Sequence, residues 1–273
     1  MGKENRFTPP EVITKENLPA VLTEIGGIRE IPGTSEMLIP QIRAVRKRVE
    51  ELGELSIAVQ LYQEEFLSAH HMVMEEKTQE NKMNYLRLAR GVLIMGRAIS
   101  KMEMYLEKHG ENLTPFIKAQ IFRYLGRYAD LIQRQPQRAE EHYRQWLEYF
   151  EATAPPAEKH IRLEALGFVA HSLLEQGKIE EGIQLVQQTL KDFNETEEGK
   201  QLKERDYYTW SVWKSGIENR TAEFLLKTKK PEYAELAKKL IAAAKVTLTM
   251  PENAQQQPLH RLDELKGTER LID

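Results

Sequence analysis

The chain has 273 residues, of which 41% are hydrophobic and 30% are charged, so it can bury a sizeable core and is not disordered. Its formal net charge of −3 provides no strong attraction to nucleic acid or to an anionic membrane. The absence of cysteine excludes disulfides, thiol nucleophiles and cysteine-ligated metals, and suits a reducing compartment.

The first residues, MGKENRFTPPEV, are polar and contain no apolar signal core. No stretch of the sequence approaches the length of a membrane span. We therefore expect a cytoplasmic protein without membrane insertion. Only five of the 42 acidic residues are aspartate, and this preference for glutamate is typical of a chain that is mostly helix with short connections.

The first third of the chain predicts an N-terminal extension followed by long helices. In the extension, 1–33, the Phe7-Thr-Pro-Pro segment is expected to be extended. Asn17 would cap a short helix over 18–25, which Gly26 and Gly27 would end. Apolar residues three and four apart then predict helices over 36–51 and 54–76, separated by Gly53. The stretch 79–108 is either one long helix or two helices broken near Gly91 or Gly96.

The remaining pattern is also helical. Thr114 and Pro115 are a start signal for a helix that reaches about residue 133. Further helices are predicted over 138–150, 158–175, 179–193 and 200–228, and from Pro231 to about residue 249. The tail 251–273 is expected to be flexible. Sustained alternation of apolar and polar residues is absent from the sequence, so about ten helices and no strands are predicted.

One hairpin has a distinctive pattern. Its first helix presents Leu166, Val169 and Leu173 on one face with the small Ala170 among them, Gly177 makes the turn, and Ile179, Gly182, Val186 and Leu190 line the second helix. Two small residues at these places predict that the backbones at Ala170 and Gly182 approach each other closely.

This hairpin resembles a tetratricopeptide repeat, with departures at Leu173, Thr189 and Asn194. Weaker matches start at Gly53, Leu125 and Ala237. Gly126 and Ala170 are 44 residues apart, and Ala58 and Ala139 are 81 apart, or two steps of about 40, whereas the usual period is about 34. The resemblance implies an all-α, right-handed solenoid of stacked antiparallel helical hairpins over 34–250. A helical bundle without repeats also fits the pattern.

Patterns that carry chemistry are weak. His71 and Glu75 are four residues apart, but such a pair is more typical of a solvated helix contact than of a metal site. The Gly91–Gly96 spacing matches a phosphate-binding loop, but Arg97 and Ala98 stand where that motif has Lys and Ser or Thr. This apolar segment is expected to pack in the core. No metal, no cofactor and no enzymatic activity are predicted.

The resemblance implies a concave groove that binds peptides or partner helices. The repeat register places on that side Arg43, Lys47, Gln120, Arg123, Arg127, Asp130, Glu164, His171 and Glu175. Arg43 with Lys47, and Arg123 with Arg127, are four apart and share a helix face, which favours an acidic peptide or helix as partner. These residues could equally be ordinary solvated helix charges, and so could the basic run from Arg43 to Arg48.

The predicted role is therefore a protein- or peptide-binding scaffold of the helical-repeat kind, without nucleic acid as a partner. A ligand-sensing regulatory domain and a helical enzyme with an unrecognised site are the two alternatives. The oligomeric state is left open.

Overall fold

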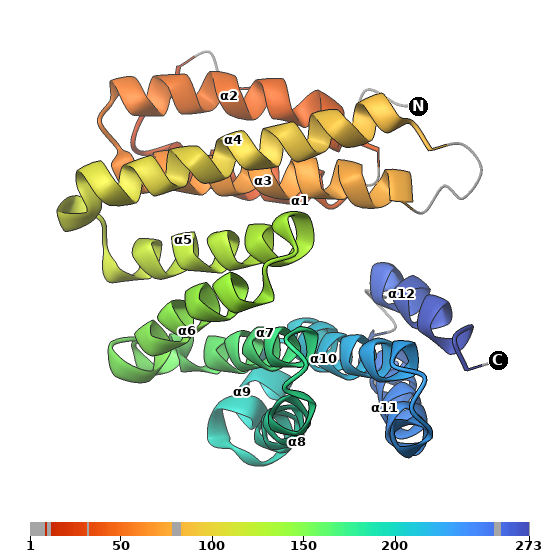
Figure 1. Ribbon diagram of the computed structural model, residues 1–273. Helices are drawn as coiled ribbons and strands as arrows, with labels where there is room; N and C mark the ends of the chain where they lie inside the picture. The colour runs from red at the N-terminus through yellow and green to blue at the C-terminus, as the bar shows by residue number, and fades with distance from the viewer. Residues whose placement is uncertain (1–8, 10–11, 32, 78–82, 254–257, 273) are drawn as a thin grey trace. The chain divides into compact units, whose positions relative to one another are not determined.

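The computed structural model describes the chain except residues 1–8, 10–11, 32, 78–82, 254–257 and 273 (Figure 1). Helix accounts for 86% of the described residues, and none of them lies in a strand. The prediction of an all-helical chain is confirmed. Among the expected features, the extended segment at Phe7, Thr8 and Pro10, the residues 79–82 and the glutamines 255–257 lie outside the described residues.

The chain forms two compact units, Met1–Ile132 (unit 1) and Gln133–Asp273 (unit 2). Unit 1 contains helices α1 (Leu18–Arg29), α2 (Ser35–Glu51), α3 (Leu55–Lys77), α4 (Tyr85–His109) and α5 (Pro115–Tyr128), with a short 3-10 turn at Gly110–Asn112. A π-helical turn, Ala129–Gln133, lies where the units meet in the sequence.

Helix α3 is the centre of unit 1, because it packs against α1, α2, α4 and α5. Its sequence is apolar around much of its circumference, as a helix with neighbours on several sides requires. Leu61, Phe66, Ala69 and Met72 are all fully buried.

Two helix boundaries in unit 1 differ from the predictions. Helix α1 continues through Gly26 and Gly27 to Arg29, because Ile25 is buried and Ile28 packs against the same core. Burial of these isoleucines offsets the cost of about 1 kcal/mol that each helical glycine carries. Leu18 and Ile25 are fully buried, so this helix belongs to the core of unit 1.

The stretch 79–108 contains one helix, α4, which starts at Tyr85 because the Asn84 side chain caps the backbone N–H groups of Leu86 and Arg87. Gly91 lies inside it. A Cβ at Gly91 would be 2.7 Å from the Val73 side chain and 3.2 Å from the Ala69 carbonyl oxygen. This glycine therefore allows α4 to approach α3 closely and does not break the helix.

Unit 2 contains helices α6 (Pro136–Ala152), α7 (Arg162–Glu175), α8 (Ile179–Glu195), α9 (Glu197–Arg205), α10 (Tyr207–Lys227), α11 (Pro231–Thr249) and α12 (Leu259–Glu269). Two 3-10 turns, Pro156–Ile161 and Pro251–Asn253, precede α7 and follow α11.

The stretch predicted as a single helix over 200–228 is two helices, because the Asp206 side chain caps α10 by accepting the Thr209 N–H. Helix α12, with its buried Leu265, occupies part of the tail that was expected to be flexible.

Helices α7 and α8 form the hairpin that the sequence predicts. Gly177 adopts φ +79° at the turn. A Cβ at Gly182 would be 3.2 Å from the Ala170 carbonyl oxygen and 2.7 Å from the Leu174 side chain. The predicted close approach at Ala170 and Gly182 is confirmed.

Candidate functional site

Helix α4 has apolar residues on its exposed face as well as on its buried one. Its buried face includes Ile94, Met95, Ala98, Ile99 and Met102 and packs against α3. On the other face Tyr85 is 73% exposed, Leu86 85% and Leu93 54%. A single exposed apolar side chain is ordinary, but several along one helix mark a surface that can bind a partner.

This exposed face lines a groove in unit 1 with a volume of about 1320 Å³. Helix α4 contributes most of the lining, from Tyr85, Leu88, Ala89, Val92, Leu93, Gly96, Arg97, Ala98, Ser100, Lys101 and Met104. The other contributors are Arg43 and Arg46 of α2, Tyr62 and Glu65 of α3, and Tyr128 of α5.

The polar part of the groove is built around the Glu65 carboxylate, which is 2% exposed. Arg43 donates to one carboxylate oxygen from Nε at 2.6 Å, with its Nη2 2.5 Å from the same oxygen. Arg46 donates to the other oxygen through Nη1. The Arg46 guanidinium also lies 4.0 Å from the centre of the Tyr62 ring. Two arginines on α2 therefore neutralise a carboxylate on α3 that burial alone would destabilise.

Beside this cluster, the side chains of Tyr62 and Tyr105 share Glu50 as their hydrogen-bond acceptor. The hydroxyls of Tyr62 and Tyr105 donate to Glu50 Oε1 at 3.0 and 3.1 Å. Burial, reinforced by Glu50, raises the pKa of Tyr105 to about 12, and burial likewise raises the pKa of Tyr62. Both hydroxyls therefore stay protonated and keep donating, which ties α2, α3 and α4 together.

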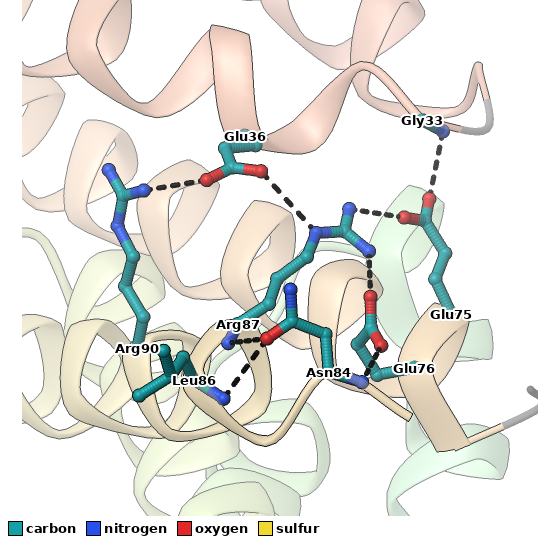
Figure 2. A network of polar contacts seen from close by, with 8 residues as sticks. All are labelled: Gly33, Glu36, Glu75, Glu76, Asn84, Leu86, Arg87 and Arg90. Atoms are coloured by element: carbon teal, nitrogen blue, oxygen red, sulfur yellow. Dashed lines mark hydrogen bonds and ion pairs between the residues drawn. The ribbon is translucent and has the colours of Figure 1, made fainter. Parts of the chain in front are cut away.

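The Tyr85 end of the groove is fixed by a second network (Figure 2). Arg87 of α4 reaches Glu76 through Nη1 at 2.6 Å, Glu75 through Nη2 at 2.8 Å and Glu36 through Nε at 3.4 Å. Arg90 also contacts Glu36, at 2.6 Å. The hydrogen bonds that Arg87 donates to Glu76 and Glu75 raise the pKa of Arg87. Both networks therefore connect helices that line the groove.

The pair His71 and Glu75 has other partners. Glu75 accepts the Gly33 N–H at 2.9 Å in addition to its contact with Arg87. His71 Nδ1 lies 3.2 Å from the Arg29 carbonyl oxygen, and burial lowers the pKa of His71. Within the described parts of the chain, no three His, Asp or Glu side chains are grouped as metal ligands.

None of the helices in the described parts of the chain is long and apolar enough to cross a bilayer.

The predicted binding residues of unit 1 have different environments. Arg43 lines the groove, and Lys47, one turn further along α2, is exposed. On α5 and the turn that follows it, Gln120 and Asp130 are buried. Arg123 and Arg127 are half-buried, and the Arg123 guanidinium is 5.8 Å from the centre of the Tyr124 ring.

In unit 2, Glu164 is buried and Glu175 is exposed. His171 Nε2 lies 3.9 Å from Glu175 Oε1. Burial, together with the positive charge of Arg220, lowers the pKa of His171 to about 3, so this histidine is neutral at pH 7 and does not form an ion pair. The predicted groove takes residues from both units, and it stays a prediction.

The exposed face of α4 is the feature that the sequence reasoning missed. The apolar segment from Gly91 to Gly96 was expected to pack in the core, yet Leu93 within it is 54% exposed. The available signal was that α4 is apolar on two opposite faces, so that it needs a second apolar neighbour.

A comparison of the chain with models of protein families found no match, and searches of curated proteins and of solved structures found none either.

Proposed function

We propose that this protein is a protein-binding scaffold that holds a segment of a partner in the groove along α4. The observation that carries the proposal is the row of exposed apolar side chains on α4, which includes Tyr85 and Leu93, in a groove whose helices are joined by ion pairs. A resemblance of the α7–α8 hairpin to tetratricopeptide repeats supports the same class of function.

The size of the groove favours a peptide over a small molecule. Pockets for small molecules usually enclose about 300–1,000 Å³ and cover most of the ligand. This groove is larger, and Leu93 and Tyr85 on its wall are more than half exposed. From Tyr85 to Met104 the lining follows α4 for about 30 Å at about 1.5 Å per residue, which is the length of a peptide helix of about 20 residues.

The test is a substitution in the groove with a matched control elsewhere. Leu93→Glu places a charge in the groove, and Val246→Glu makes a similar change at an exposed apolar residue of α11, 62% exposed. Partners are captured from cells with the wild-type chain, and the segment that binds is then produced and titrated against all three proteins.

We expect Leu93→Glu to weaken binding of that segment at least tenfold and Val246→Glu to leave it unchanged. Because both residues are exposed, the helical circular dichroism and the melting temperature should not change in either variant. Equal affinity of wild type and Leu93→Glu would exclude the groove as the binding site.

A further inference from the structure

We infer that the groove binds an amphipathic α-helix with acidic residues along one edge. This inference depends on the proposed function, since it names the class of segment that the groove receives. Its support comes from the charges of the lining and from the distribution of small and large residues along α4.

The groove is basic in a protein that is acidic overall. Its lining contains the four cations Arg43, Arg46, Arg97 and Lys101 and one carboxylate, Glu65, which leaves an excess of three positive charges. The whole chain has a formal charge of −3. Clefts lined by charges of one sign attract ligands of the opposite sign and select against ligands of the same sign.

Three of these cations can contact a bound segment. Arg97 and Lys101 are exposed, stand four residues apart on one side of α4, and form no ion pair among the residues that the structure describes. Arg43 uses Nε and Nη2 for Glu65, and its side chain is still 38% exposed. Arginine binds carboxylates strongly because its fork of N–H groups matches the two carboxylate oxygens.

The apolar lining has the form that receives a helix. The exposed small residues Ala89 and Ser100 are eleven positions apart on one face of α4, with the larger Val92 and Leu93 between them and Met104 one turn beyond. Gly96 lies on the same face, but Tyr128 covers it, since the Tyr128 hydroxyl would be 2.8 Å from a Cβ added there. Residues eleven apart are three turns apart on one face of a helix, and small residues beside large ones accept the projecting side chains of a second helix. An extended peptide has a repeat of two residues and would not match this spacing.

A second copy of the chain fits the charges poorly. In a two-fold dimer each subunit offers the same patch, so the Arg97 and Lys101 side chains of both copies would gather in one interface. Like charges brought together in this way disfavour binding. The partner is therefore a different segment that supplies the carboxylates.

Three synthetic peptides of about 20 residues test the inference. The first places leucine and alanine on one helix face and glutamate on both edges. The second has lysine in place of every glutamate. The third has the composition of the first in an order that has no apolar face. Fluorescein-labelled peptides are titrated with the full chain, and anisotropy gives the Kd.

The protein variants separate the acidic edge from the apolar face. Arg97→Glu with Lys101→Glu reverses the charges in the groove. Lys238→Glu with Lys239→Glu makes the same change at two exposed lysines of α11, and Leu93→Glu disrupts the apolar lining.

We expect the glutamate peptide to bind wild type at least tenfold more tightly than the other two, with an affinity that falls as salt rises from 50 to 500 mM. The Arg97/Lys101 reversal should weaken it at least tenfold, and the Lys238/Lys239 reversal should not.

If the glutamate and lysine peptides bind wild type with equal affinity and neither binds Leu93→Glu, the preference for an acidic segment is overturned and the proposed function is supported. Binding that Leu93→Glu does not weaken would count against both. The inference is also overturned if the glutamate peptide fails to bind, if the protein binds vesicles of phosphatidylcholine and phosphatidylserine instead, or if light scattering shows a dimer that Leu93→Glu dissociates.

Discussion

Arg46 and Glu65 form an ion pair in which the carboxylate is 2% exposed and the arginine also lies against the Tyr62 ring. The two residues are 19 positions apart on neighbouring helices, α2 and α3. The Glu65 carboxylate is buried, and it holds the guanidinium groups of Arg46 and Arg43 at the groove. The two arginines therefore need this carboxylate to keep their positions.

Glu65→Gln should destabilise the protein by roughly 3 kcal/mol, because Arg43 and Arg46 would lose the carboxylate that neutralises them. Urea denaturation followed by circular dichroism measures the loss. Glu51→Gln, at an exposed position of α2, is the control and should change the free energy of unfolding by less than about 0.5 kcal/mol. If Arg46→Met added to Glu65→Gln restores no stability, the two residues are not coupled as the structure shows.

Gly182→Leu should cost about 1–3 kcal/mol, because the new side chain would collide with Leu174 and with the Ala170 backbone. Gly267→Leu on α12 is the matched control, since a Cβ at Gly267 has no atom within 4 Å among the described residues. Thermal melts of the two variants should differ by several degrees. Equal melting temperatures would contradict the packing of the α7–α8 hairpin.

His171 should make the protein less stable in mild acid. Its folded pKa of about 3 is below its ordinary value of 6.5, so the unfolded chain takes up the proton first as the pH falls. The stability that His171 contributes is therefore complete above about pH 6.5 and is lost between that pH and about 3. His171→Gln should reduce the slope of unfolding free energy against pH in this window by up to one proton, about 1.4 kcal/mol per pH unit. Parallel slopes for wild type and variant would show that His171 titrates normally.

The sequence predicted the helices well where local signals decide their ends. Thr114 caps α5 by accepting the Ile117 N–H, and Gly177 makes the α7–α8 turn, both at the predicted places. The predicted end of the first helix at Gly26 and Gly27 was wrong, because the burial of Ile25 outweighs the tendency of glycine to end a helix.

The candidate site was less predictable, because a pattern of apolar residues does not tell which of two apolar faces finds a neighbour. Leu93 and Ile94 are adjacent in the sequence, yet one is 54% exposed and the other 4%. The ion-pair partners of charged residues could not be predicted from the sequence either. Arg43 and Glu65 are 22 positions apart and come into contact only because α2 packs on α3. Only Arg43 of the predicted binding residues lines this groove.

A tryptophan in the groove should report binding directly. The three natural tryptophans, Trp146, Trp210 and Trp213, are all in unit 2, so Leu93→Trp gives unit 1 its one tryptophan. Because Leu93 is 54% exposed, the new indole should emit at long wavelength in the free protein. The glutamate peptide should cover it, move the added emission to shorter wavelength and protect it from quenching by acrylamide. Val246→Trp, placed at the exposed site on α11, should show neither change when the same peptide is added. Equal responses of the two tryptophans would mean that the peptide binds without occupying the groove along α4.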